Sequence, residues 1–224
     1  MVISLHSRPA FSLRLASTGR LIGVALLALA ISACATRQPT PETSQWEPHQ
    51  RALLELRHWQ LEGKMGYRSP GESGSAFIRW QQQEDAFSLV LTGPFGAGAT
   101  RIEGNQDIAV LSESGKEDIV APTPTELTQW LFGWELPVNQ MIEWVKGVPA
   151  PQPAHQQIHF NPAGQLEQLE QQGWLLDFDK FQQVGQWVLP GRIRGNRGAV
   201  SFTLVIKQWH PGEPVPGQTQ PSGQ

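Results

Sequence analysis

The segment Trp59–Tyr67 reads WQLEGKMGY, with apolar or small residues at its odd positions and mostly polar residues at its even positions. Because successive side chains of a β-strand point to opposite faces, this period of two predicts a strand with one buried face. The segment Val200–Trp209 reads VSFTLVIKQW and repeats the pattern, with Val200, Phe202, Leu204 and Ile206 on one face. These two segments predict a mainly β protein.

Further strand signals lie on both sides of a central helical region. Apolar alternation or short apolar runs occur at Ala76–Gln81, Phe87–Leu91, around Ile102, and at Ile108–Leu111, Trp174–Phe178 and Trp187–Ile193. Turn-forming residues at Asn161–Gly164 and at Gly195-Asn196 indicate antiparallel hairpins.

Three helices are expected from capping patterns and helical apolar periodicity. The clearest start is Thr123, followed by Pro124 and by Glu126 three residues after the cap. The predicted start and end residues are Ser44 and Arg57, Thr123 and Gly133, and Pro137 and Gly147. The order is one helix, about six strands, two helices and a second run of strands, which predicts an α+β arrangement with helices against one face of an antiparallel sheet.

Two kinds of interior are compatible with such a sheet. Its apolar side chains either interdigitate with those of the helices as a solid core, or the sheet curves around a cavity. Because cavities are energetically costly, the residue pattern by itself favours the solid core.

The amino terminus has the order of an export signal. Residues 21–31 are an apolar run that follows Arg8, Arg14 and Arg20. A helix of this length reaches about 16 Å, and because a bilayer span needs about 20 apolar residues the run is interpreted as a signal core. The sequence ISAC at 31–34 resembles the bacterial lipobox, which implies removal of residues 1–33 and lipid on Cys34. The alternative is an ordinary secretory signal that ends near Cys34.

Composition limits the remaining possibilities. Cys34 is the single cysteine, which excludes a disulfide framework and a thiolate metal cluster. The net charge of −3 without a basic stripe argues against nucleic-acid binding. Residue 35 is Ala and not Asp, and by the enterobacterial sorting rule this favours the outer membrane. Residues 34–45 are expected to be a lipidated tether, 46–209 a single domain, and 210–224 a disordered tail rich in Pro, Gly and Gln.

A longer series of residues resembles the LolB family of outer-membrane lipoprotein receptors. The matching residues are Trp46, His49, Gly63, Gly66, Trp80-Gln81-Gln82, Leu89–Leu91, Gly93–Gly96, Leu136-Pro137-Val138, Trp144, Gly147, Pro149, Pro151, Gly173-Trp174, Leu189-Pro190, Leu204, Ile206 and Trp209. The resemblance implies an unclosed antiparallel β-barrel with helices covering its concave face around an apolar cavity. It reverses the preference for a solid core.

The same resemblance implies a function and partners. Such a protein accepts acylated lipoproteins from the periplasmic carrier LolA and inserts them into the inner leaflet of the outer membrane, facing the periplasm on its own lipid anchor. It is expected to act as a monomer, without catalysis, cofactor or metal. Candidate cavity-lining residues are Trp59, Leu61, Met65, Ile78, Trp80, Leu89, Leu91, Leu127, Trp130, Ile142, Trp144, Phe202 and Leu204.

The loop Thr92–Gly98 carries one large apolar residue, Phe95, between small ones that include Pro94 and Gly96. An exposed apolar side chain at a loop tip invites a functional explanation, whereas the alternative is that Phe95 folds back onto the core. In the LolB family this loop presents an apolar residue, often Leu, that is needed for membrane insertion, and the resemblance implies that role for Phe95.

Arg192, Arg194 and Arg197 lie close together in the sequence. They are interpreted either as a solvated strand edge that discourages pairing or as a basic rim that contacts an acidic carrier. His155 and His159 lack the Glu of a zinc-protease helix, and Gly-x-Ser-x-Gly is absent from the sequence. Two other function classes stay open: a scaffolding outer-membrane lipoprotein with no lipid ligand, and an anchored hydrolase whose site carries no recognised motif.

Overall fold

Strand β1 (His58–Ser69) lies at the centre of the fold, where it pairs with β2 (Glu72–Gln83) on one side and with β13 (Val200–Pro211) on the other. A computed structural model describes residues 41–93 and 98–212 of the chain. β1 contains the stretch Trp59–Tyr67, whose alternating pattern is confirmed: Trp59 and Leu61 are buried, whereas the intervening Gln60 and Glu62 are partly exposed.

One antiparallel sheet of eleven strands contains both central strands, in the order β6-β5-β4-β3-β2-β1-β13-β12-β9-β8-β7. On the β2 side the strands are β3 (Ala86–Thr92), β4 (Ala99–Gly104), β5 (Ala109–Glu113) and β6 (Ile119–Ala121). On the β13 side they are β12 (Arg192–Arg197), β9 (Trp174–Asp179), β8 (Leu166–Gln171) and β7 (Gln157–Phe160). Within the described residues the terminal strands β6 and β7 do not pair with each other, so the sheet is unclosed, as expected.

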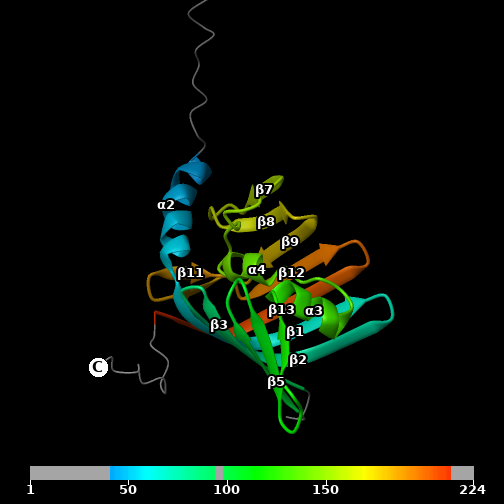
Figure 1. Cartoon of the computed structure of the whole chain (residues 1–224). Helices are drawn as coiled ribbons and strands as arrows, with labels where there is room; N and C mark the ends of the chain where they lie inside the picture. The colour runs from blue at the N-terminus through cyan, green and yellow to red at the C-terminus, as the bar shows by residue number, and fades with distance from the viewer. Residues whose placement is uncertain (1–40, 94–97, 213–224) are drawn as a thin grey trace, which may run out of the picture. The chain divides into compact units, whose positions relative to one another are not determined.

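In the part of the chain that the structure describes, three helices accompany the sheet, α2 (Pro41–Glu55), α3 (Pro124–Phe132) and α4 (Val138–Trp144). The chain runs through six strands to α3 and α4 and then returns to the sheet, which confirms the predicted order. Figure 1 shows α3 and α4 in front of the sheet, and side chains of both helices line the same pocket as side chains of β1 to β4. The mainly β fold with helices on one face is therefore confirmed.

The ends of α3 follow the predicted capping chemistry. The Thr123 hydroxyl accepts a hydrogen bond from the Glu126 amide, at 3.1 Å, and Pro124 occupies the start of the helix. Gly133 has a φ of 71°, and its amide donates to the Gln129 carbonyl. The left-handed conformation costs glycine little, so this residue ends the helix.

The start of α2 differs from its prediction. The helix begins at Pro41, ahead of the predicted cap at Ser44, and includes residues assigned to the tether. It also continues through Pro48. Similarly, β13 extends to Pro211 and so includes the first residues of the predicted tail.

The segment Trp187–Ile193, predicted as one strand, is two. Residues Trp187–Leu189 form β11, which pairs with β10 (Gln182–Val184) in a separate two-stranded sheet, and β12 starts at Arg192. Pro190 lacks an amide donor for a continuous ladder. A Cβ on Gly191 would lie 2.4 Å from the Lys180 carbonyl oxygen, so the backbone passes too close for a side chain there.

The hairpin predicted at Gly195-Asn196 is displaced. Gly195 lies inside β12 opposite Phe202, and the turn falls at Gly198, which has a φ of 58°. A Cβ on Gly195 would meet the Phe202 ring at 2.2 Å, so this glycine makes room for an aromatic side chain. The turn predicted at Asn161–Gly164 does join β7 to β8.

Candidate functional site

An apolar pocket of about 230 Å³ lies between the β1–β4 part of the sheet and the helices α3 and α4. Nearly every residue around it is apolar or small. They are Met65, Tyr67, Gly74, Ser75, Ala76, Ile78, Trp80, Phe87, Leu89, Leu91, Ile102, Pro124, Leu127, Thr128, Phe132, Trp134, Leu136, Val138 and Met141.

Strand register explains why these side chains meet. Trp80 pairs with Leu89, and Leu89 pairs with Ile102, so three apolar side chains form a row across neighbouring strands. Two residues along β2, on the same face, Ile78 pairs with Leu91. Residues that share a face at paired positions have Cβ atoms about 5 Å apart, so the sheet supplies a continuous apolar wall.

Small residues leave the space open. Gly74, Ser75 and Ala76 line the pocket from β2, and Ala76 pairs with Met65 of β1. Larger side chains at these positions would fill the volume, because protein interiors otherwise pack to about the density of organic crystals.

The other half of the sheet encloses a solid core. Leu204, Trp174 and Leu176 are fully buried, and the rings of Trp174 and Phe202 pack with their centroids 5.3 Å apart. Both interiors considered from the sequence are therefore present in different halves of the same sheet.

The thirteen candidate cavity residues divide between these two interiors. Met65, Ile78, Trp80, Leu89, Leu91 and Leu127 line the apolar pocket. The expectation is wrong for the buried residues Trp59, Leu61, Trp144, Phe202 and Leu204, which belong to the core. Aromatic packing explains the first: Trp59 packs against Trp80 and Trp209 at centroid distances of 5.4 and 5.6 Å, and its side chain is buried.

Two helical candidates also need correction. Trp130 is 56% exposed and lies outside the buried stripe of α3, which is formed by Pro124, Leu127 and Thr128. Ile142 of α4 is half-buried and lines a separate, more polar groove. The apolar period of a short helix did not distinguish its inner face from its outer face.

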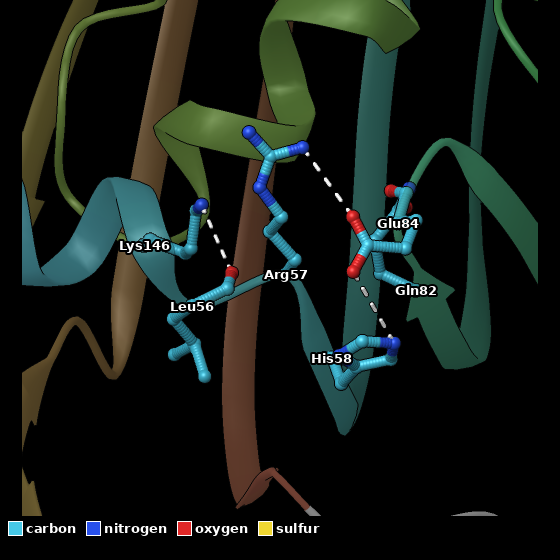
Figure 2. A network of polar contacts seen from close by, with 6 residues as sticks. All are labelled: Leu56, Arg57, His58, Gln82, Glu84 and Lys146. Atoms are coloured by element: carbon cyan, nitrogen blue, oxygen red, sulfur yellow. Dashed lines mark hydrogen bonds and ion pairs between the residues drawn. The ribbon is translucent and has the colours of Figure 1, made fainter.

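A buried lysine fastens the end of α4 to the end of α2 (Figure 2). The Lys146 ammonium donates to the Leu56 carbonyl, at 3.2 Å, and lies 2.9 Å from the Glu143 carboxylate. Burial lowers the pKa of Lys146, and the Glu143 charge opposes that shift. Buried charges persist when they are paired and hydrogen-bonded, so Lys146 is a structural tie.

Figure 2 also shows an exposed ion-pair group beside this tie. The Glu84 carboxylate lies 3.3 Å from the Arg57 guanidinium and 3.6 Å from the His58 imidazole. The Gln82 amide donates to the Glu84 carbonyl, at 2.8 Å. These contacts fix the β2–β3 turn next to the start of β1.

Gln171 provides a second buried tie behind α4. Its side-chain oxygen accepts from the Trp144 indole at 2.7 Å and from the Ala150 amide at 3.0 Å. Its amide group donates to the Ala150 carbonyl, at 2.8 Å. The sequence analysis did not predict the roles of Lys146 and Gln171, because lysine and glutamine side chains are normally solvent-exposed.

The predicted lipidation and insertion residues Cys34, Pro94, Phe95 and Gly96 lie outside the described residues. At the base of the loop between β3 and β4, the Gly93 amide donates to the Gly98 carbonyl at 3.4 Å.

The three arginines lie on an interior strand, since β12 is hydrogen-bonded to both β9 and β13. The interpretation as a solvated edge is therefore wrong. Arg192 makes two hydrogen bonds to the Asp179 carboxylate, at 2.7 and 2.6 Å, and holds the pKa of Asp179 below its usual value. Arg194 lies 3.4 Å from the same carboxylate.

Arg197 contacts the segment that follows α3. Its guanidinium donates to the Glu135 carbonyl, at 2.9 Å, and stacks 5.0 Å from the Trp174 ring. The residues on either side of Glu135, Trp134 and Leu136, both line the pocket.

The described part of the chain contains no helix with the length and apolarity to cross a membrane. Among the same residues, no three His, Cys, Asp or Glu side chains lie together as metal ligands would.

An unclosed antiparallel sheet with an apolar pocket beneath two helices defines a class of proteins that bind apolar ligands. A sequence model of the family described as "Outer membrane lipoprotein LolB" matches residues 57–209, and the chain belongs to this family. It is 37% identical over 191 residues to the outer-membrane lipoprotein LolB of Stutzerimonas stutzeri, a match that covers 83% of this chain and 92% of the relative.

Two further comparisons gave similar proteins. The outer-membrane lipoprotein LolB of Cellvibrio japonicus is 33% identical over 191 residues, covering 84% of this chain and 94% of the relative. The crystal structure of a LolA superfamily protein from Nitrosomonas europaea is similar with a TM-score of 0.48 and 8% identity, covering 79% of this chain and 96% of that one.

Membership of the family gives the protein its general role. It is an outer-membrane lipoprotein receptor in lipoprotein localisation, and the outer membrane is its location. The family is one of receptors and not of enzymes. A scaffolding protein with no ligand is not favoured.

We predict that Lys146→Met lowers the free energy of unfolding by about 2–4 kcal/mol, because the Leu56 carbonyl loses its donor and the Glu143 carboxylate its counter-charge. Arg57→Met is the control: it breaks an exposed pair with Glu84, for which less than about 1 kcal/mol is expected. Urea unfolding measures both, and equal losses would contradict the assignment of Lys146 as the structural tie.

Proposed function

We propose that this protein accepts acylated lipoproteins from a LolA-type carrier into the apolar pocket and inserts them into the inner leaflet of the outer membrane. The pocket carries the proposal: it is lined by apolar side chains and lies between a curved wall of strands and a helical cover. Membership of the LolB family supports the carrier and the cargo as partners.

The energetics of acyl chains explain the need for a pocket. A buried methylene is worth about 0.8 kcal/mol, so full exposure of a triacylated lipoprotein with about 40 methylenes costs roughly 30 kcal/mol. Such cargo crosses an aqueous compartment only when its chains stay covered. A receptor that binds the chains more favourably than the carrier does can take them over without nucleotide hydrolysis, and we infer no catalytic step.

The size of the pocket indicates how cargo is held. An apolar cavity of about 150 Å³ accepts benzene, so a volume of about 230 Å³ holds only a segment of one acyl chain. Binding of the remaining chains requires α3 and the segment that follows it to move away from the sheet. The hydrogen bonds of Lys146 and Gln171 hold the carboxyl-terminal end of α4 in place during that movement.

We predict that Ala76→Phe reduces cargo acceptance. Ala76 lines the pocket, and a phenyl ring there excludes acyl methylenes. Exclusion of two methylenes weakens binding by about tenfold. Transfer of an acylated lipoprotein from carrier to receptor measures the effect, and Ala86→Phe, at an exposed position of β3, is the matched control. Unchanged acceptance by the folded Ala76→Phe variant would show that the cargo binds elsewhere.

We further propose that Phe95, between Pro94 and Gly96, enters the lipid interface and promotes release of the acyl chains. The flanking strands support this proposal, because the loop connects β3 and β4, which contribute Leu91 and Ile102 to the pocket wall. An exposed large apolar side chain at the tip of a loop invites a functional explanation.

Phe95→Glu is predicted to slow delivery to membranes by about tenfold or more, since a charge replaces an apolar group that gains about 1.5–3 kcal/mol on burial. Acceptance from the carrier should be unchanged, and Phe95→Leu should retain delivery. Separate assays of acceptance and of vesicle insertion distinguish the two steps. Normal delivery by Phe95→Glu would exclude this role.

We infer that residues 1–33 are removed and that Cys34 carries the anchoring lipid, which leaves residues 34–45 as the connection to the domain. The basic, apolar and lipobox parts occur in the order that this processing requires. A lipidated Cys34 has no free thiol, so the mature chain should take up no thiol reagent.

We also propose that the carrier contacts the arginine cluster, mainly through Arg194 and Arg197. Arg192 is already neutralised by Asp179, whereas Arg197 makes no ion pair within the described residues and contacts the Glu135 carbonyl after α3. Replacing both arginines by Gln should slow carrier association at low salt by about threefold to tenfold and flatten its salt dependence. Arg101→Gln on β4 is the control, and an unchanged rate and salt dependence would remove the cluster from the interface.

A further inference from the structure

Phe77 is exposed on the face of β2 that points away from the pocket. Its neighbours Ala76 and Ile78 both line the pocket, and because side chains alternate along a strand, Phe77 points to the opposite, outer face. The side chain is 46% exposed. A large aromatic residue at the middle of a sheet face, away from any helix, is in contact with water in the isolated protein.

Basic side chains surround Phe77. The Lys64 ammonium lies 5.8 Å from the centre of the ring, from the paired position on β1. A hollow of about 240 Å³ next to the ring is lined by Arg79, Val90 and Lys207, among others. We name Lys64, Phe77, Arg79, Val90 and Lys207 the outer-face patch.

The patch carries a local positive charge although the chain as a whole is acidic. Its one neighbouring carboxylate, Glu62, lies 2.9 Å from Arg79 and is neutralised by it. Within the part of the chain that the structure describes, neither Lys64 nor Lys207 has a carboxylate at ion-pair distance. Two positive charges without counter-ions therefore flank an exposed ring.

The strand register places the patch beside the loop between β3 and β4. Phe77 pairs with Thr92, the last residue of β3, and Thr92 pairs with Ala99, the first residue of β4. Paired residues have Cα atoms about 5 Å apart, so Phe77 stands one strand away from the point where the chain leaves the sheet.

We propose that the outer-face patch is a membrane-contact surface for a bilayer with anionic headgroups. Phe77 enters the boundary between headgroups and acyl chains, while Lys64, Arg79 and Lys207 reach the headgroup phosphates. An aromatic ring with lysines around it fits this interface, because the lysine stems lie along apolar surface while their ammonium groups stay in the polar layer. A protein partner at this surface, in place of a membrane, would need carboxylates opposite these lysines and an apolar pocket for the ring.

The proposal rests on the proposed function only in that the protein works at a lipid surface. It adds an orientation: the half of the sheet around β2 and β3 faces the lipid, and the half around β8 and β7 faces away from it. Leu175 on β9 provides the contrast. It is likewise an apolar residue on the outer face, 39% exposed, but it pairs with Glu170 and Asn196 and has no cationic partner.

The test uses the lipidated chain reconstituted into vesicles of phosphatidylethanolamine and phosphatidylglycerol. Cys34 is the single cysteine, so Phe77→Cys and Leu175→Cys each supply one free thiol for an environment-sensitive fluorophore. The two positions are four strands apart, about 19 Å at about 4.8 Å per strand. The unsubstituted chain, which should take up no label, is the labelling control.

We expect the fluorophore at residue 77 to report an apolar environment and to be quenched by lipids brominated on their acyl chains, and the fluorophore at 175 to remain in water. Adding Lys64→Gln or Lys207→Gln should shift the partition of the residue-77 fluorophore between lipid and water toward water, by about fivefold for each lysine. Lys116→Gln, on the turn after β5, should have no effect. Replacing phosphatidylglycerol by phosphatidylcholine should act like the lysine substitutions.

Equal quenching at 77 and 175 would overturn the proposal, and so would shielding of residue 77 by the carrier in the absence of vesicles. Delivery of cargo by the same labelled proteins separates this inference from the proposed function. Normal delivery of cargo together with an unquenched fluorophore at residue 77 would exclude the membrane-contact role of the patch and leave the proposed function standing. Quenching of the fluorophore at residue 77 in a protein that neither accepts nor delivers cargo would support the membrane-contact role of the patch and exclude the proposed function.

Discussion

The pairing of β1 with both β2 and β13 decides which side chains share an interior. This double pairing puts Leu61 beside Trp80 on one side and beside Trp209 on the other, and the remaining strands extend the same face outward in register. A shift of one residue would turn the whole apolar set to the solvent. The pocket wall, the solid core and the charged outer face all depend on this register.

The contrast between the two halves of the sheet explains how one fold combines a core with a cavity. Around Trp174 and Phe202, aromatic rings fill the space under the strands. Gly195 has no side chain, which leaves room for the Phe202 ring. Around Ala76, small residues leave space that helix α3 covers without filling. The solid half supplies stability, and the hollow half keeps the apolar pocket open.

Two buried polar residues fix the cover of the pocket at one end. Lys146 joins the end of α4 to the end of α2, and Gln171 joins the segment after α4 to β8. The cover is therefore attached on the side of the solid core, whereas α3 contacts the hollow half through apolar side chains such as Leu127. Apolar contacts tolerate exchange with a lipid chain far better than a buried ion pair tolerates loss of a partner.

The sequence by itself determined the central strands, the capped helix α3 and the resemblance to the family, because alternation, caps and motif order are local properties. Met65, Ile78 and Leu89, which the family resemblance made candidates for the cavity, line the pocket. Only the tertiary structure decided that Trp59 and Leu204 fill a core, that Trp130 is exposed, and that Arg192 is neutralised by Asp179. Those outcomes depend on which distant strand or helix lies opposite each side chain, and the period of a single segment contains no information about its partner.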